Sequence, residues 1–206
     1  MDYTEIKYYV QEGIASIVLN SPQNLNALTV PMVDSLIAAL DDCDEDYNIK
    51  AVIISGEGNS FSAGGDIRMM LRGLEGDMKE LRLAVRKVSL AALRIRNLRK
   101  PVIAAVHGNM AGAGVNLALT CDFRIAADNL KFIQAFVNLG LVPDCGGTFL
   151  LTRLLGIARA TELIMTGRPV TAREALELGL VNQVVPLQDL SQAAKEMAIR
   201  FTKMPG

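Results

Sequence analysis

Short apolar runs and amphipathic stretches of helical period alternate along most of the chain. Each run is bounded by turn residues, which is the pattern of buried or half-buried β-strands. The turn signal Glu12-Gly13 separates the first two runs. We predict strands over residues 6–10, 14–19, 51–55, 102–106, 122–126 and 181–185.

Helical stretches lie between these strands and carry start signals. Thr29 can cap a helix with Pro31 in its first turn, and apolar residues recur at helical spacing over 32–40. Thr171 and Glu174 form a capping box, in which hydroxyl and carboxylate each satisfy an exposed backbone donor. Further helices are predicted over residues 76–98, 112–120, 147–155, 158–166 and 187–203. We therefore expect an α/β fold in one domain over residues 1–206.

Composition narrows the class of protein. The 21 Lys and Arg against 22 Asp and Glu give a formal net charge of −1, so the chain as a whole does not attract nucleic acid or an anionic membrane. No apolar run approaches the ~18 residues of a membrane span, and residues 1–5 lack the features of a signal peptide. Cys43, Cys121 and Cys145 share no CxxC spacing and only one histidine is present, so we expect reduced thiols, a cytoplasmic location and no metal site.

Two glycine-rich turns, residues 61–67 and 107–114, are each placed between a buried strand and a helix. Such turns expose N–H groups at a helix N-terminus, where the dipole favours negative charge. Two donors aimed at one point would form an oxyanion hole for an enolate or a tetrahedral oxyanion. The alternative is that these glycines only permit tight turns. Neither segment matches a phosphate-binding P-loop or a dinucleotide fingerprint.

Together these segments resemble the crotonase (enoyl-CoA hydratase/isomerase) superfamily. The resemblance runs from about residue 5 to about residue 203. The matching blocks stand in the family's order at residues 26–28, 61–66, 101–108, 117–122, 140–148 and 172–185.

The resemblance implies a spiral of ββα units whose usual C-terminal helices are shortened or missing here. It implies a thioester substrate carried on coenzyme A, no permanently bound cofactor, and assembly as a homotrimer or hexamer. The oxyanion hole would be formed by the N–H groups of Gly65 and Ala113. The residues expected along the coenzyme A path are Asn24, Leu25, Ala63, Asp66, Ile67 and Arg68.

The reaction is indicated by two residues that differ from the family's hydratases. Those enzymes use two glutamates to hold and activate water, and the corresponding positions here are Asn116 and Phe136. An amide cannot act as the base and a phenyl ring binds no proton, so hydration by the usual pair is disfavoured. Asn116 is expected to orient the substrate or a catalytic acid, or to be a buried structural amide.

Asp144 supplies a different carboxylate, within residues 140–147. It matches an aspartate used by family isomerases, and the motifs are most similar to the epoxyphenylacetyl-CoA isomerases of the phenylacetate pathway. A single acid beside an oxyanion hole suits proton shuttling, and hence isomerisation of an acyl-CoA thioester. The alternative is that Asp144 caps the following helix.

Two other functions remain open on the sequence. One is an enoyl-CoA hydratase in which Asp144 and another acid hold water, with Glu75, Asp77 and Glu80 as weak candidates for that acid. The other is a non-catalytic acyl-CoA binding protein. Residues 69–71 (Met-Met-Leu) could line an acyl pocket or fill the core. His107 is assigned a packing or turn role.

Overall fold

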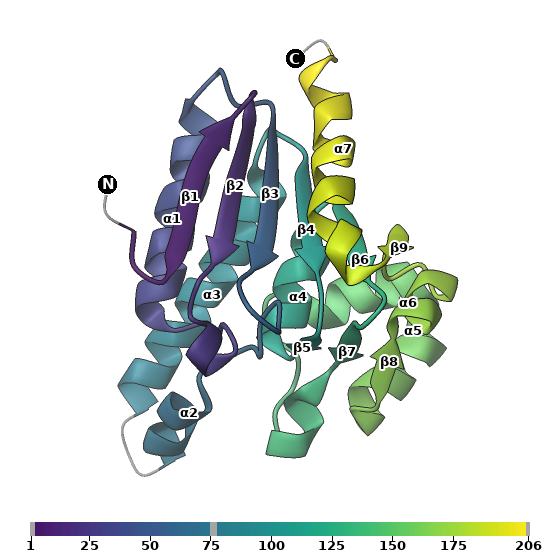
Figure 1. Ribbon diagram of the computed structural model, residues 1–206. Coiled ribbons are helices and arrows are strands. Elements are labelled where there is room, and N and C mark those ends of the chain that lie inside the picture. Colours follow the sequence, from purple (N-terminus) through teal and green to yellow (C-terminus); the bar gives the residue numbers. More distant parts are fainter. Residues whose placement is uncertain (1–2, 75–77, 205–206) are drawn as a thin grey trace.

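A six-stranded sheet forms the centre of the molecule in the computed structural model, which describes residues 3–74 and 78–204 (Figure 1). Its order is β1-β2-β3-β4-β6-β9, with β1 antiparallel to β2 and every other pair parallel. The strands are β1 (Ile6–Gln11), β2 (Ile14–Leu19), β3 (Ala51–Gly56), β4 (Val102–Val106), β6 (Phe123–Ala127) and β9 (Gln183–Val185).

A smaller sheet lies beyond the carboxyl ends of the parallel strands (Figure 1). It consists of β5 (Asn109–Ala111), β7 (Lys131–Ile133) and β8 (Pro169–Thr171), with β5 parallel and β8 antiparallel to the central β7. The sequence did not predict these strands, because three residues are too few to show a period.

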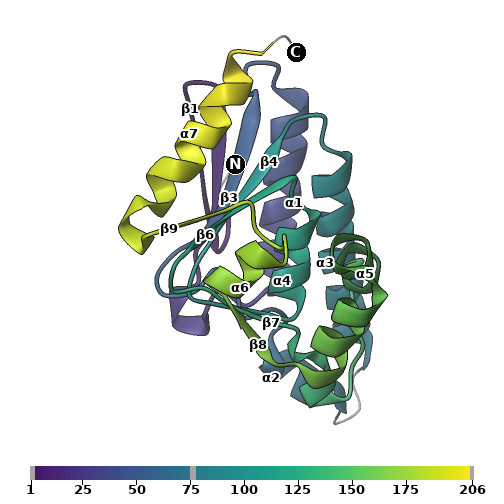
Figure 2. The same cartoon turned by 90° about the vertical axis from the view of Figure 1, so that its right-hand side faces the viewer.

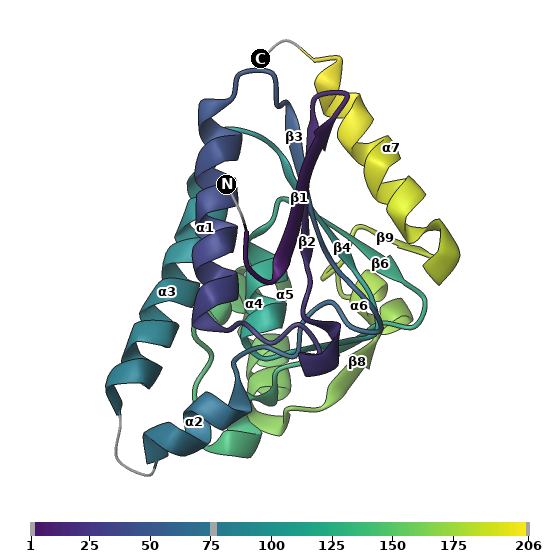
Figure 3. The ribbon, with the colours of Figure 1, turned by 60° about the vertical axis from the view of Figure 1, so that its left-hand side comes forward.

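Helices cover both faces of the large sheet, with α1 and α3 on one side and α7 on the other (Figures 2 and 3). They are α1 (Val30–Glu45), α2 (Ile67–Leu74), α3 (Met78–Asn97), α4 (Ala113–Thr120), α5 (Gly147–Thr166), α6 (Ala172–Glu177) and α7 (Leu190–Thr202). Three 3₁₀ turns complete the described elements, η1 (Pro22–Asn24), η2 (Ala135–Leu139) and η3 (Leu187–Asp189).

Successive residues of β4 pack into two different hydrophobic cores, one on each face of the sheet. Ala104 packs into the main core on the α1, α3 and α4 side, whereas Ile103 and Ala105 pack against Leu190 and Ala194 of α7. All five residues of β4 are buried. A parallel strand covered on both faces reads as a continuous apolar run, which is why its sequence predicted it correctly.

Several local predictions are confirmed. The Thr29 hydroxyl accepts from the N–H of Met32, and the Thr171 hydroxyl accepts from the N–H of Glu174, so both cap their helices. The other half of the predicted capping box is not formed, because the Glu174 carboxylate accepts from the Arg168 guanidinium. At Gly156, where one helix was predicted to end, α5 is kinked by a non-helical backbone (φ +74°, ψ +164°).

Other boundaries differ from the prediction. The helix expected over 76–98 is α3, and its predicted first residues, 76 and 77, lie outside the described residues. The separate helix α2 was not predicted. The helix expected over 187–203 begins as the turn η3 and becomes α-helical at Leu190, and the strand expected over 181–185 spans only Gln183–Val185.

Candidate active site

The two glycine-rich turns lie side by side, because they follow β3 and β4, which are neighbours in the sheet. The N–H of Phe61 donates to the His107 carbonyl (3.0 Å), and the N–H of Ala111 donates to the Ser62 carbonyl (3.0 Å). Ser62 also forms a parallel bridge with Met110. These backbone hydrogen bonds fix the position of each turn relative to the other.

Each expected donor follows a glycine with positive φ. Gly64 (φ +89°) precedes Gly65, and Gly112 (φ +50°) precedes Ala113. A Cβ on Gly64 would lie 2.6 Å from the carbonyl oxygen of Ala111, so the close approach of the turns also requires glycine there. The glycines therefore also allow the close approach of the two turns that carry the expected donors, Gly65 and Ala113.

The backbone leaves both donors available. Ala113 is the first residue of α4, and the first N–H groups of a helix have no intrahelical acceptor. The N–H of Leu28 donates to the Gly64 carbonyl (2.7 Å). This hydrogen bond links Leu28 to the first turn without using the N–H of Gly65. The partial positive charge at the start of α4 adds to the attraction for an oxyanion.

A small cavity connects these donors with Asp144. Its volume is about 30 Å³, room for a water molecule. Its lining residues come from the segment before α1, from the two turns, from α2 and α3, and from the segment before α5: Leu28, Gly65, Asp66, Met69, Met70, Leu81, Ala84, Val85, Val88, Ala113 and Asp144. Leu71, grouped with the two methionines in the sequence, is exposed and lies outside this lining.

Asp144 is held at the cavity by its main chain. Its carbonyl accepts from the N–H of Gly147 (2.7 Å), whereas its buried Oδ1 has no hydrogen-bond partner among the described residues. Burial raises the pKa of this carboxyl above its ordinary value of 3.8. The alternative that Asp144 caps α5 is wrong, because the N-cap is Gly146 and no side chain caps that helix.

Asn116 is fully buried behind Asp144. Its Nδ2 donates to the main-chain carbonyl of Asp144 (3.0 Å), and its Oδ1 accepts from Nε2 of Gln134 (2.9 Å). Phe136 is also buried, and its ring lies next to Gly112 of the second turn. The two positions that hold glutamates in family hydratases thus carry an amide committed to the protein and a ring without a proton.

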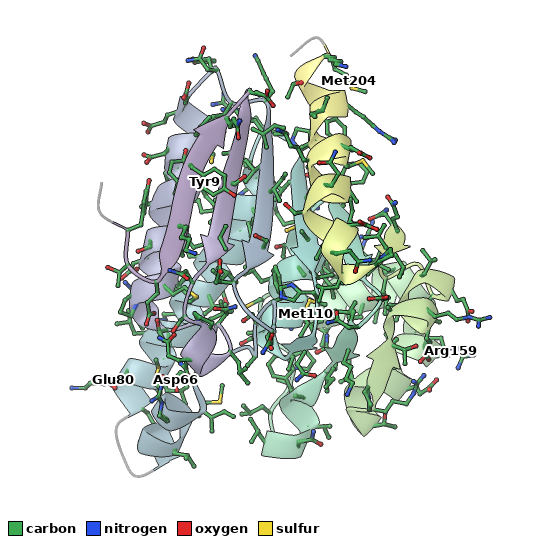
Figure 4. All side chains as sticks on the ribbon, in the orientation of Figure 1. Tyr9, Asp66, Glu80, Met110, Arg159 and Met204 are labelled. Carbon is green, nitrogen blue, oxygen red and sulfur yellow. The ribbon has the colours of Figure 1, made fainter. Side chains whose placement is uncertain are left out.

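Among the residues expected along the coenzyme A path, Asp66 lines the cavity, and the other five form a rim outside its lining. The N–H of Ala63 donates to the Leu25 carbonyl (2.9 Å), which brings two of these segments together. The Asp66 carboxylate accepts from the N–H of Arg68 (2.9 Å) at the start of α2 (Figure 4). Ile67 and Arg68 are exposed. Asn24 is half-buried at the end of η1, beside Leu25. Coenzyme A binding by this rim stays a prediction.

Other candidates lie elsewhere. His107 bonds through Nε2 to the carbonyl of Gly58 (2.9 Å) and lines a different hollow, beneath α7. Glu80 is exposed on α3 (Figure 4), and Glu75 and Asp77 lie outside the described residues. Among residues 3–74 and 78–204, no group of three or more His, Cys, Asp or Glu side chains could hold a metal ion. In the same part of the chain, no helix is long and apolar enough to cross a bilayer.

Two features of the site were missed by the sequence analysis. Gln134 was not recognised as the partner of Asn116, and no signal in the sequence indicates that bond. Four residues of α3 line the cavity, and helical spacing could have found them, because Leu81 and Val85, like Ala84 and Val88, are separated by one turn.

Comparison with known proteins identifies the family. The family model for enoyl-CoA hydratase/isomerase matches residues 9–205. A trans-2-decenoyl-[acyl-carrier-protein] isomerase from Streptococcus mutans is 40% identical, with 98% of this chain and 78% of the relative covered. The 1,2-epoxyphenylacetyl-CoA isomerase of Escherichia coli is 37% identical (96% and 76% covered), and the short-chain-enoyl-CoA hydratase of Clostridium acetobutylicum is 40% identical (91% and 72%).

Solved structures agree. An enoyl-CoA hydratase from Bacillus anthracis superposes with a TM-score of 0.91 at 36% identity, with 96% of this chain and 76% of that chain covered. DspI from Pseudomonas aeruginosa gives a TM-score of 0.94 at 30% identity (100% and 78% covered). The crotonase-like fold predicted from the sequence is therefore confirmed, and the chain belongs to the enoyl-CoA hydratase/isomerase family.

Proposed function

We propose that the protein is an acyl-thioester isomerase in which Asp144 moves a proton while the N–H groups of Gly65 and Ala113 hold the thioester oxygen. The observation that carries this proposal is that all three residues line one cavity, from three separate segments of the chain. Asp144 brings to it a carboxyl oxygen that no other described residue engages.

The chemistry follows from this arrangement. The ionised Asp144 takes a proton from a carbon next to the thioester carbonyl, or from its vinylogous position, and the electrons of that C–H bond pass to the carbonyl oxygen. The two N–H donors stabilise the resulting enolate. Asp144 then returns its proton to another carbon of the conjugated system, so the double bond migrates and no water is consumed.

Burial of Asp144 supports both halves of this cycle. A carboxylate whose pKa is raised is a stronger base than an ordinary aspartate, and its protonated form remains a competent acid. The surroundings of Asn116 disfavour the alternative of an enoyl-CoA hydratase. A water-activating pair would need a second acid, and Asn116 and Phe136 supply none.

Hydration nevertheless remains the second candidate, because the relatives include a short-chain-enoyl-CoA hydratase at 40% identity. The isomerase preference agrees with the names of two relatives, which are isomerases of a decenoyl and an epoxyphenylacetyl thioester. We further propose coenzyme A as the carrier, with Arg68 on the exposed rim facing its phosphates, and a homotrimer or hexamer as the assembly.

One experiment separates the reactions. The protein is incubated in D₂O with a trans-3-enoyl-CoA and, separately, with a trans-2-enoyl-CoA. An isomerase creates a conjugated thioester from the first and incorporates deuterium, whereas a hydratase destroys the conjugation of the second. Asp144→Asn should abolish exchange and leave thioester binding intact. Hydration without exchange, or full exchange by Asp144→Asn, would refute the proposal, and saturable binding with no reaction would leave only an acyl-CoA binding protein.

A further inference from the structure

A line of hydrogen bonds runs from Gln134 to the main chain of Asp144. Gln134 is 1% exposed and follows β7, while Asn116 is 0% exposed in α4. Nε2 of Gln134 donates to Oδ1 of Asn116 (2.9 Å), and Nδ2 of Asn116 donates to the Asp144 carbonyl (3.0 Å). Three segments that are distant in sequence therefore meet behind the cavity.

The Asp144 carbonyl at the end of this line determines which group donates in each hydrogen bond. A main-chain carbonyl only accepts hydrogen bonds, so Asn116 must present its NH₂ group to Asp144. Its oxygen must then face Gln134, which must present a donor. This assignment leaves Oε1 of Gln134 buried without a partner among the described residues. The Gln134 side chain thus forms a hydrogen bond through its NH₂ group and none through its oxygen.

Gly147 completes the support of Asp144. Its N–H donates to the same carbonyl (2.7 Å), and a Cβ on Gly147 would overlap the amide of Asn116. The Asp144 peptide is therefore held by two donors from different helices, α4 and α5. Neither of these donors engages Oδ1 of its carboxyl group, which stays unpaired and buried.

We propose that Gln134 is a positioning residue for Asp144 and acts through Asn116, an inference that rests on the proposed function. In this arrangement the location of the carboxyl group is fixed through its main chain, whereas its basicity is set by burial. A donor placed directly on the carboxylate would stabilise the ionised form and weaken the base. Hydrogen bonds from the side chains of Cys145 and Asn116 lower the pKa of Asp144 by less than burial raises it, so support that acts mainly through the main chain keeps this effect small.

Two substitutions test the line. Gln134→Leu removes the donor at similar size, so the Asn116 amide loses its fixed orientation. Misplacement of a reacting group by about 1 Å can cost about a hundredfold in rate. We expect kcat for deuterium exchange into a trans-3-enoyl-CoA to fall by about tenfold to a hundredfold with KM unchanged.

Gln134→Glu tests the direction of the bonds. An ionised glutamate cannot donate to Oδ1 of Asn116 and instead attracts its NH₂ group, which turns the Asn116 oxygen against the Asp144 carbonyl. A protonated glutamic acid can donate, and burial favours this form. The ratio of Gln134→Glu to wild-type kcat should therefore rise as the pH falls. At the end of this line lie two ionisable residues whose pKa is raised by burial, Asp144 and Cys145. Taking the ratio removes the effect of their titration on wild-type activity.

The matched control is Gln183→Glu, which makes the same change at an exposed position of β9 and should leave kcat at the wild-type level at every pH. Circular dichroism establishes folding, and Gln134→Glu decides if Gln134→Leu does not fold. Wild-type kcat in folded Gln134→Leu, or a ratio for Gln134→Glu that is constant with pH, overturns the inference. Full turnover by Asp144→Asn instead overturns the proposed function. An inactive Asp144→Asn beside fully active Gln134 variants overturns this inference alone.

Discussion

The terminal methyl group of Met70 lies in the space that a side chain on Gly65 would occupy. Met70 comes from α2, and Gly65 is one of the two expected oxyanion donors. With this methyl in place the shared cavity has about 30 Å³, less than a thioester group requires. We therefore predict that an acyl substrate displaces the Met70 side chain, which an unbranched thioether allows through its three side-chain torsions.

This contact predicts coupling between the two positions. Gly65→Ala should fold, because the added Cβ meets only the flexible end of Met70. It should lower kcat/KM by about tenfold, equivalent to about 1.4 kcal/mol of transition-state stabilisation, since the displaced methionine competes with the thioester. Met70→Ala in the same chain should recover most of this loss.

A double-mutant cycle on kcat/KM measures the coupling. Gly64→Ala is the comparison, because its Cβ would meet backbone and its φ is +89°. Met70→Ala should not rescue that variant. If Gly65→Ala lowers kcat/KM equally in the wild-type chain and in Met70→Ala, the Met70 side chain does not control access to the N–H of Gly65.

The N–H of Ala113 can be removed without breaking its helix. Proline is tolerated at the first position of an α-helix, where the missing N–H has no intrahelical partner. Ala113→Pro should therefore keep the fold and lower kcat by about 10²- to 10³-fold, the usual cost of losing one oxyanion donor. Ala113→Gly, which retains the N–H, is the control and should stay close to wild type. Turnover of the proline variant at the wild-type rate would exclude Ala113 from the oxyanion hole.

The activity should depend on the ionisation of Asp144. As the base, Asp144 works when ionised, and its pKa lies above 3.8 because it is buried. The exchange rate should fall as the pH is lowered, with a midpoint above that of an ordinary aspartate. A pH profile of kcat/KM reports this midpoint for the free enzyme. An acid limb at the ordinary aspartate value would contradict the burial of the working carboxyl.

Elements whose signal lies within a few neighbouring residues could be predicted from the sequence, and elements that depend on distant segments could not. The strand Val102–Val106 and the cap at Thr29 are local features, and both are confirmed. The strands of the smaller sheet have three residues each and owe their pairing to distant segments, so no local pattern reveals them.

The candidate site divides in the same way. The two glycine-rich turns could be found from the sequence, whereas Gly65 and Ala113 were assigned as their donors through the family resemblance. The bond between Gln134 and Asn116 joins β7's end to α4, and only the folded chain brings them together. Asp144 was identified through a family resemblance, and its role as a helix cap was a reasonable alternative until Gly146 proved to hold that position.

Asp144 should also cost the protein stability. Its pKa is raised in the folded state, so between 3.8 and that raised value the native protein binds more protons than the unfolded chain. The free energy of unfolding then decreases as the pH rises through this window, and the cost persists at neutral pH. Asp144→Asn should accordingly unfold at a higher urea concentration than wild type at pH 7, despite being inactive. The difference should vanish below pH 3.8, where both side chains are neutral.

Glu174→Gln is the control of opposite sign. The Arg168 guanidinium lowers the pKa of Glu174, so its carboxylate contributes stability that is present above its ordinary pKa and lost as the pH falls. The two side chains of this surface pair are 35% and 33% exposed, and the pair should contribute no more than about 1 kcal/mol. Glu174→Gln should therefore unfold at a slightly lower urea concentration at pH 7, while Asp144→Asn moves the other way. A loss of stability in Asp144→Asn would mean that the carboxylate has partners in solution, and Asp144 would then lack the raised pKa that its role as the base requires.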